Sequence, residues 1–560
     1  MLCKEITMND EKLTITFPDG KSVEIKKETY ASELLKYFKD KPEEILAVKL
    51  NNKIYSLDQK LKYSAKIEPV YLNTKDGADV YRRSLRFLLA SAAHALFPEA
   101  RLVVGHSLGN GYYYTIETSK KITEKDISAI QEKMKQMVQQ NIPIETEMLS
   151  YEEAAAHFEK MGLVKTRKQL NYIAPPRVTV NTIQGFSDLY FGPLVLSTGV
   201  LKVFALRPYG NGFLLRFPAS KDHSVLPEFK DEPKLFEIFS KYKDWGKRIG
   251  VTAAADLNEL VTKRKVNDFI DITETFQEKN IAEIADQIVQ KKTVRVVLIA
   301  GPSSSGKTTT SKKLALELQA MGYTPKVISL DCYYVDHSLT PLDENGNPDY
   351  ECLEALDVDL LNQNLVDLFA GKEVIIPSYD FHEGKPSFEE KNKMTLGENE
   401  ILIMEGIHGL NPRLTPKIKD ELKFKIYLSA LTQLNLDDHN HIPTSDNRLI
   451  RRIVRDYQFR GKSAAGTIAM WPSVQKGERL HIFPFQNNAD AILNTALDYE
   501  LSVLKVYAEP LLRCVTPNQP EYAQACQLLS FLNNFASIAP TQVPVRSIIR
   551  EFIGGSAFHY

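Results

Sequence analysis

The sequence contains little of what stabilises secreted or membrane proteins. Five cysteines are scattered over 560 residues without a C-x-x-C pair, which argues against a disulfide framework or a zinc knuckle and fits a reducing cytoplasm. No apolar run approaches the roughly 20 residues that a membrane-spanning helix needs. The first residues, MLCKEITMNDEK, lack the apolar segment of a secretory signal. We therefore expect a cytoplasmic protein with no membrane partner.

An excess of charge of either sign is also absent. The formal net charge is −1 at pH 7, so we expect no global attraction to nucleic acid or membranes, although local basic patches remain open. Apolar residues make up 43% of the chain and charged residues 25%, as in ordinary globular proteins. This length predicts about three or four domains.

The most informative stretch runs from Val294 to Thr309 and reads VRVVLIAGPSSSGKTT. A short apolar run, typical of a strand buried on both faces, leads into the phosphate-loop pattern G-x-x-x-x-G-K-[ST]. Glycines let the backbone point successive N–H groups at phosphate oxygens, while Lys307 can reach the β- and γ-phosphates and the Thr308 hydroxyl can bind Mg²⁺. We therefore predict ATP and Mg²⁺ as cofactors. The residues predicted to hold the nucleotide are Gly301, Pro302, Ser303, Ser304, Ser305, Gly306, Lys307, Thr308 and Thr309.

Two acidic residues follow later apolar segments. KVISL (326–330) ends at Asp331, and ILIM (401–404) ends at Glu405. In open α/β sheets, groups at the carboxyl ends of the strands line the ligand site. An acid there can take a proton from an attacking hydroxyl or help to hold Mg²⁺. We predict that Asp331 and Glu405 lie beside the phosphate loop and share the metal with Thr308.

Further segments carry a family resemblance. DYECLEALD (349–357), PSYDF (377–381) and RLIRRIVRDYQFRG (448–461) occur in sequence order with GPSSSGKTT, SLDCYY and IMEGIH. Together they resemble the uridine/cytidine kinase branch of the phosphoribulokinase superfamily, from about residue 290 to 495. The resemblance implies a P-loop kinase domain with a parallel sheet at 293–500. It also implies an enzyme that transfers a phosphoryl group from ATP to the 5′-hydroxyl of uridine or cytidine.

The resemblance also implies residue roles. Asp331 would be the general base, and Lys307, Arg451 and Arg455 would complete the catalytic set. The residues that would bind the acceptor are Tyr334, Glu351, Tyr379, Phe381 and Arg448.

The arginines of the last segment have a helical spacing. Arg448, Arg451, Arg452 and Arg455 follow an i, i+3, i+4, i+7 pattern, which places them on one helical face. There they would neutralise charge on the transferring phosphoryl group. The alternative is a solvated basic helix whose arginines pair with nearby acids.

Two departures from the family affect the acceptor. Family members carry a histidine that contacts the pyrimidine a few residues after Tyr-Asp-Phe, and here that position is Gly384, with His382 two residues earlier. Glu351 matches an aspartate in family members. The kinase reaction depends on neither residue, whereas the identity of the acceptor depends on both.

The N-terminal third follows other patterns. Residues 11–72 read as hairpin, helix and hairpin, with a Pro-Asp-Gly turn, and this order predicts a β-grasp fold. ITFPDGKSVEI resembles the TGS domain of threonyl-tRNA synthetases and some GTPases. In residues 73–235, RRSLRFLLASAAHA, GHSLGNGYYYTIE and DLYFGP resemble the second additional domain of threonyl- and alanyl-tRNA synthetases, which hydrolyses mischarged tRNA. This resemblance implies an α+β editing-like fold.

The metal ligands of that editing domain are missing from this sequence. In the family, two histidines on the first helix join a cysteine and a histidine near a Gly-Pro to bind zinc. None of the matching side chains is an ordinary zinc ligand, so we expect the fold without this metal chemistry. Three histidines nearby, His94, His106 and His157, have no spacing that indicates another metal site. The matching positions are Arg83, Phe87, Tyr190 and Leu194.

The remaining segments complete a multidomain α/β and α+β chain. Residues 236–292 are charged and predict a helical connector, and residues 501–560 a C-terminal helical extension. With residues 1–72, 73–235 and 293–500, they give five predicted regions. The alternative function is a nucleotide-switched RNA- or tRNA-binding protein linked to translation. A third hypothesis is a kinase whose N-terminal domains sense a metabolite, and a homo-oligomer is left open.

Overall fold

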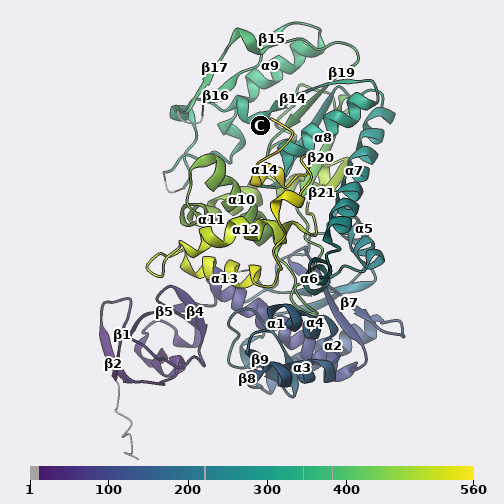
Figure 1. Cartoon of the computed structure of the whole chain (residues 1–560). Helices are drawn as coiled ribbons and strands as arrows, with labels where there is room; N and C mark the ends of the chain where they lie inside the picture. Colours follow the sequence, from purple (N-terminus) through teal and green to yellow (C-terminus); the bar gives the residue numbers. More distant parts are fainter. Residues whose placement is uncertain (1–11, 220–221, 345, 381–382, 560) are drawn as a thin grey trace, which may run out of the picture.

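A computed structural model describes residues 12–219, 222–344, 346–380 and 383–559. The N-terminal sheet lies at one end of the molecule, the editing-like region beside it, and the parallel sheet of the C-terminal half at the other end (Figure 1). No helix of these residues is long and apolar enough to cross a membrane.

The N-terminal region is a mixed sheet in the order β2-β1-β5-β3-β4. β1 and β5 are parallel and the other neighbours are antiparallel. Leu13 and Ile15 are buried while Lys12 and Thr14 are exposed, because successive side chains of a strand point to opposite faces. The predicted helix is a short 3₁₀-helix, Ala31–Tyr37. The strands are β1 (Lys12–Thr16), β2 (Ser22–Lys26), β3 (Ile45–Leu50), β4 (Lys53–Ser56) and β5 (Ala65–Tyr71).

The editing-like region is built around a long helix, α1 (Lys75–Leu96), whose first turn is capped by the Thr74 side chain. Two sheets, β11-β12-β7-β6 and β10-β9-β8, accompany this helix. The strands are β6 (Arg101–Leu108), β7 (Gly111–Glu117), β8 (Glu145–Ser150), β9 (Arg177–Ile183), β10 (Phe186–Asp188), β11 (Ala205–Tyr209) and β12 (Gly212–Arg216). The remaining helices are α2 (Glu124–Gln139), α3 (Tyr151–Lys160) and α4 (Val164–Ile173).

Three helices, α5 (Pro233–Ile249), α6 (Ala254–Thr262) and α7 (Val266–Gln290), lead into the parallel sheet of the C-terminal half. Its order is β14-β19-β13-β20-β21, and all neighbouring strands are parallel. The carboxyl ends of all five strands therefore share one edge. The strands are β13 (Val296–Ala300), β14 (Thr324–Ser329), β19 (Glu400–Glu405), β20 (Lys423–Ser429) and β21 (Ala491–Asn494).

Helices cover both faces of this sheet. Val296 and Leu298 pack in the cluster that contains α9 (Val358–Phe369), whereas Val297 and Ile299 pack with α7 and α8 (Lys307–Ala320). Burial on both faces explains the continuous apolar run of the sequence. Short antiparallel pairs flank the sheet: β15 (Val374–Ile375) with β18 (Lys393–Met394), and β16 (Ser378–Asp380) with β17 (Lys385–Ser387).

The last helices pack on one another beside the sheet (Figure 1). They share a buried cluster with α6 and the start of α7. The chain's final segment thus belongs to a core rather than to the surface. These helices are α10 (Thr444–Arg460), α11 (Ala464–His481), α12 (Glu500–Arg513), α13 (Tyr522–Leu532) and α14 (Arg550–Ile553).

Candidate active site

The phosphate loop connects β13 to α8, as the sequence pattern requires. Gly306 has φ +81° and Ser304 φ +59°, so the loop uses the left-handed region twice, where glycine is favoured. A Cβ on Gly301 would lie 2.5 Å from the Leu428 carbonyl oxygen, so only glycine fits against β20. The Lys307 ammonium donates to the carbonyl oxygens of Gly301 and Pro302 at 3.1 and 3.3 Å. The Lys307 side chain therefore folds back onto the phosphate loop.

The two predicted acids lie at the same edge as the loop. Glu405 ends β19, between β13 and β14 in the sheet, and accepts a hydrogen bond from the Thr308 hydroxyl at 3.1 Å. Burial raises the pKa of Glu405 to about 7, with Asp331 adding to the rise and Lys307 opposing it. A carboxyl so close to a hydroxyl and a second acid can bind a cation once it is ionised.

Asp331 lies in the turn that follows β14 and its side chain is exposed to solvent. The surrounding protein raises the pKa of its carboxyl, while Lys307, Arg460 and Arg455 lower it. These charges place Asp331 within electrostatic reach of the loop lysine and of α10. The structure therefore brings Lys307, Asp331 and Glu405 to one site.

The predicted acceptor residues come from the segment after β14. The rings of Tyr334 and Tyr379 lie 5.5 Å apart between centroids. Burial raises the pKa of Glu351 to about 7, and the nearby charges that act on it include Arg452, Lys307 and Asp331. Glu351 thus faces the same site as the loop. Phe381, also predicted to bind the acceptor, lies outside the described residues.

Arg451, predicted to be catalytic, is surrounded by protein groups. Its side chain is 0% exposed, and its guanidinium donates to both oxygens of Glu500 and to the carbonyl oxygens of Ser304 and Thr495. These donors are directed at protein oxygens behind the loop. Arg451 therefore holds the backbone of the phosphate loop from behind, and its catalytic role stays a prediction.

Arg448, predicted to bind the acceptor, also contacts protein groups. It forms a two-pronged pair with Glu478 and donates to the Ser303 carbonyl oxygen at 3.1 Å. Glu478 also accepts from the backbone N–H of Ser303 at 3.2 Å. Both groups are buried, so the pair supports the loop instead of an acceptor. The sequence did not single out Glu478 or Glu500, because their partners are distant along the chain.

The other two arginines remain at the mouth of the loop. Arg452 donates to the Ser303 hydroxyl at 2.8 Å, and Arg455 pairs with Asp456 at 2.7 Å. Asp456 also pairs with Arg452 and lies 3.8 Å from Arg460. Arg460 was missed by the sequence analysis, although it lies eight residues after Arg452 and so on the same side of α10. Because one carboxylate, that of Asp456, faces the guanidiniums of Arg452, Arg455 and Arg460, this group of residues has a net positive charge.

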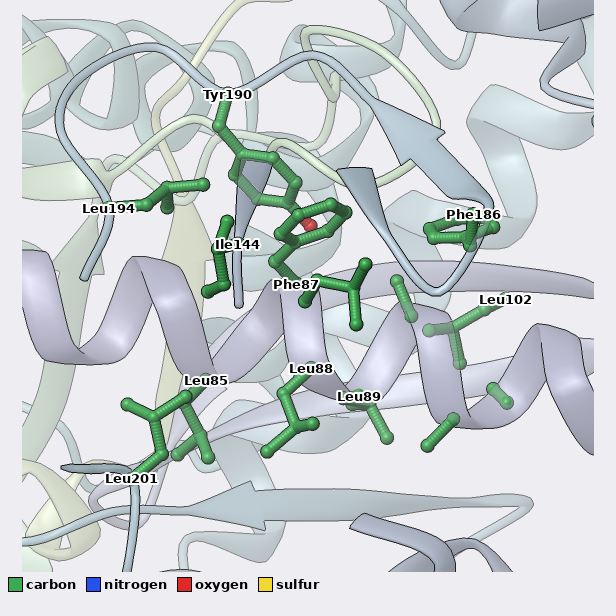
Figure 2. Packing of buried hydrophobic residues seen from close by; sticks show 14 of the residues in the cluster. Leu85, Phe87, Leu88, Leu89, Leu102, Ile144, Phe186, Tyr190, Leu194 and Leu201 are labelled. Atoms are coloured by element: carbon green, nitrogen blue, oxygen red, sulfur yellow. The ribbon is translucent and has the colours of Figure 1, made fainter. Parts of the chain in front are cut away.

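The editing-like region presents a contrasting arrangement at its four predicted positions. Phe87, Tyr190 and Leu194 are buried in one apolar cluster (Figure 2), and the rings of Phe87 and Tyr190 lie 4.9 Å apart. Arg83 donates to the Pro193 carbonyl oxygen at 2.9 Å. These side chains offer packing and a backbone contact where zinc ligands would stand.

The three histidines considered for another metal site lie against different aromatic rings. His94 packs on Phe186 at 5.0 Å, His106 on Phe239 at 5.7 Å and His157 beside Phe158 at 6.2 Å. Within the described ranges, no three histidine, cysteine or acidic side chains converge on one point.

A buried segment of the C-terminal half contacts the editing-like region near these positions. His439 Nδ1 lies 2.7 Å from Asp188 Oδ2, and the Asn440 amide donates to the Leu189 carbonyl oxygen at 2.8 Å. Arg86 lies 2.9 Å from His441. Burial alone would lower the pKa of His439, but Asp188 raises it. The two halves are therefore joined by polar contacts, of which those of His439 and Asn440 are buried.

Comparisons with known proteins separate the same two halves. Residues 296–502 match the model of the Phosphoribulokinase / Uridine kinase family. Threonine–tRNA ligases are also similar: that of Desulforamulus reducens is 35% identical over 196 residues, which are 35% of this chain and 31% of that protein. That of Acidithiobacillus ferrooxidans is 38% identical over 165 residues, 29% of this chain and 25% of that protein. The chain thus spans a third or less of the length of these ligases.

Two solved structures are also similar. A "possible uridine kinase" from Bacillus stearothermophilus is 20% identical and covers 41% of this chain and 100% of its own, with a TM-score of 0.26. D-glycerate 3-kinase from Cryptococcus neoformans is 15% identical and covers 45% and 87%, with a TM-score of 0.21. Residues 296–502 thus match the phosphoribulokinase/uridine kinase family, and the N-terminal region resembles part of threonine–tRNA ligases.

Proposed function

We propose that the chain transfers a phosphoryl group from ATP to a hydroxyl of a small molecule, with the 5′-hydroxyl of uridine or cytidine as the favoured acceptor. The family match supports the reaction class and leaves the acceptor open. The observation that carries the proposal is the meeting of Lys307, Thr308, Asp331 and Glu405 at one edge of the parallel sheet.

The loop residues would bind the phosphates. The backbone N–H groups at the start of α8 have no intrahelical partner, and a helix N-terminus favours an anion. Lys307 would leave its two loop carbonyls and donate to the β- and γ-phosphates instead. Arg452 and Arg455 would stabilise negative charge on the transferring group, while Arg451 and Glu500 hold the loop in place.

The donor set fits Mg²⁺. Thr308 and Glu405 offer a hydroxyl and a carboxylate in contact, and Asp331 is a second acid nearby. Mg²⁺ needs no cage of protein ligands, because it keeps several waters and takes phosphate oxygens. When bound, the ion would offset the phosphate charge. Asp331 would accept the proton of the attacking hydroxyl.

The acceptor assignment rests on Tyr334, Tyr379 and Glu351. The tyrosine rings offer faces for a base, and Glu351 could accept hydrogen bonds from ribose hydroxyls. Gly384, where family members carry a pyrimidine-contacting histidine, packs against His337: a Cβ there would lie 2.9 Å from His337 Cβ. An imidazole therefore lies next to that position, supplied by a different part of the chain.

A panel of nucleosides and sugars, tested with labelled ATP, examines this proposal. We expect uridine or cytidine to be the best acceptor, and Lys307→Ala to abolish the transfer. ATP turnover with no acceptor in the panel, or full activity of Lys307→Ala, would contradict the assignment. Phosphorylation of a sugar in preference to nucleosides would support the kinase assignment and contradict the assignment of uridine or cytidine as the acceptor.

The alternative function, a nucleotide-switched RNA-binding protein linked to translation, is favoured by the similarity to threonine–tRNA ligases. Filter binding of total tRNA at low and high salt tests it. Tight binding that weakens steeply with salt would support the alternative. The absence of binding would leave the N-terminal regions as structural or regulatory modules.

We also propose that the five predicted regions, 1–72, 73–235, 236–292, 293–500 and 501–560, are the domains and connecting segments of the chain.

A further inference from the structure

The C-terminal tail, defined here as residues 543–559, packs against the phosphate loop. Ile548, Ile549 and Phe552 are buried with 0% exposure. The Phe552 ring lies 5.0 Å from the guanidinium of Arg451, the residue that holds the loop from behind. The Ser547 hydroxyl lies 3.2 Å from the Tyr499 hydroxyl. The tail is therefore anchored by a core that also supports the loop.

Two tail residues contact the loop and the helix it opens. A Cβ on Gly306 would lie 2.6 Å from Ile548 Cγ2, so the tail lies directly on the glycine that precedes Lys307. The Glu551 carboxylate accepts a hydrogen bond from the backbone N–H of Thr309 at 3.0 Å and another from the Thr309 hydroxyl at 2.7 Å. A single carboxylate oxygen takes both bonds.

The position of this carboxylate conflicts with that of a nucleotide. Thr309 is the third residue of α8, so its N–H is one of the donors that a helix leaves unpaired and that phosphate loops direct at phosphates. A carboxylate oxygen and a phosphate oxygen cannot both occupy the direction of one N–H bond. Glu551 also adds negative charge near the predicted metal site, because it contributes to the raised pKa of Glu405.

We propose that the tail is an intramolecular competitor of the nucleotide, in which the Glu551 carboxylate holds the Thr309 N–H until a phosphate displaces it. The proposal rests on the proposed function, since it concerns the nucleotide of that site. The buried Ile548 and Ile549 precede α14 and keep the tail attached, so the exchange needs only a local movement of α14 with Glu551. A cation or partner that draws Glu551 away would raise the affinity for nucleotide.

The test is calorimetric titration of the full chain with a non-hydrolysable ATP analogue and Mg²⁺. Glu551→Gln keeps the shape of the side chain and removes its charge. We expect it to bind the analogue about tenfold more tightly than the unchanged protein, because a charge-assisted contact that competes with the ligand is weakened. Glu509→Gln is the matched control: Glu509 is also a C-terminal glutamate, but it pairs with Arg513, and we expect no change in affinity.

Equal or weaker binding by Glu551→Gln would overturn the proposal. A thermal-unfolding scan of each variant then shows whether Glu551 acts as a helix cap, because loss of a cap lowers the unfolding midpoint. Hydrogen exchange gives a second measure: the analogue should increase exchange in residues 547–554, and protection there would overturn the proposal. If the unchanged protein and Glu551→Gln both fail to bind nucleotide, the proposed function itself fails. If both bind equally, only the competition fails.

Discussion

The editing-like region and the kinase-family region both keep a fold, but they differ in what occupies the site. Around Phe87 and Tyr190 the positions that matched zinc ligands are filled by an apolar cluster. Around Lys307 and Glu405 the polar groups remain, and burial raises the pKa of Glu405 to about 7. A fold depends on packing volume and pattern, whereas chemistry depends on a few side-chain identities. The two regions therefore differ in the side chains at the compared positions, while each is folded around a packed core.

Buried contacts join the editing-like region to the kinase-family half. His439 and Asn440 of the kinase-family half bond to Asp188 and Leu189 of the other half. All four residues are buried. Breaking one partner of a buried charged pair is costly, because the remaining charge has no water. These contacts fix the position of the segment that leads from β20 to α10, the helix that carries the arginines.

The largest expected effect is a loss of catalytic activity when Asp331 of the kinase-family region is changed. Asp331→Asn should lower kcat by about 10²- to 10⁴-fold, because the amide cannot accept the hydroxyl proton. ATP affinity should stay unchanged, as measured by titration. Asp359→Asn, an exposed acid on α9, is the control and should be fully active. If only the acceptor KM rose, Asp331 would be a binding group and not the base.

The next effect concerns stability on the editing-like side. Phe87→His should lower the free energy of unfolding by about 3 kcal/mol, because it removes buried packing and places an unpaired polar ring in an apolar cluster. Urea unfolding measures this change, and Phe459→His, whose side chain is 57% exposed, is the control. If Phe87→His had the same free energy of unfolding as the control and abolished phosphoryl transfer, Phe87 would have a role in activity and not only in packing.

The smallest effect is a pH dependence. The pKa of Glu405 is raised to about 7 in the absence of metal, so the carboxyl is mostly protonated at pH 6 and mostly ionised at pH 8. Only the ionised form binds a cation well, and Mg²⁺ affinity should therefore rise about tenfold over this range. Titrations at constant ionic strength measure it. Glu405→Gln should bind weakly at both pH values, and a tenfold rise in that variant would assign the titration to another group.

Local sequence patterns predicted the elements better than the partners. The apolar run at β13, the alternation in β1 and the glycine pattern of the loop each depend on neighbours along the chain, and the structure shows those elements. The arginine face of α10 was also predicted. The different partners of these arginines were not predicted. Arg448 and Arg451 form buried pairs with Glu478 and Glu500. Arg452 and Arg455 pair with Asp456 instead.

The pairs with Glu478 and Glu500 required the packing of distant segments. Glu478 comes from α11 and Glu500 from the start of α12, and no spacing rule links them to α10. The tail could not be interpreted from the sequence either, since the roles of Ile548 and Glu551 appear only where they meet Gly306 and Thr309. Residues with roles of this kind carry no local signal, because the contact that defines them spans many residues.

The sequence by itself determined the phosphate loop, the resemblance of the C-terminal half to a kinase family and the lack of zinc-ligating side chains at Arg83, Phe87, Tyr190 and Leu194. Each of these follows from residue type and short-range spacing, which the chain carries before it folds. The tertiary structure decided which arginines serve the loop from behind, how the two halves are joined, and that the tail lies on the loop. Those outcomes depend on burial and on contacts between distant segments, and only the folded chain creates them.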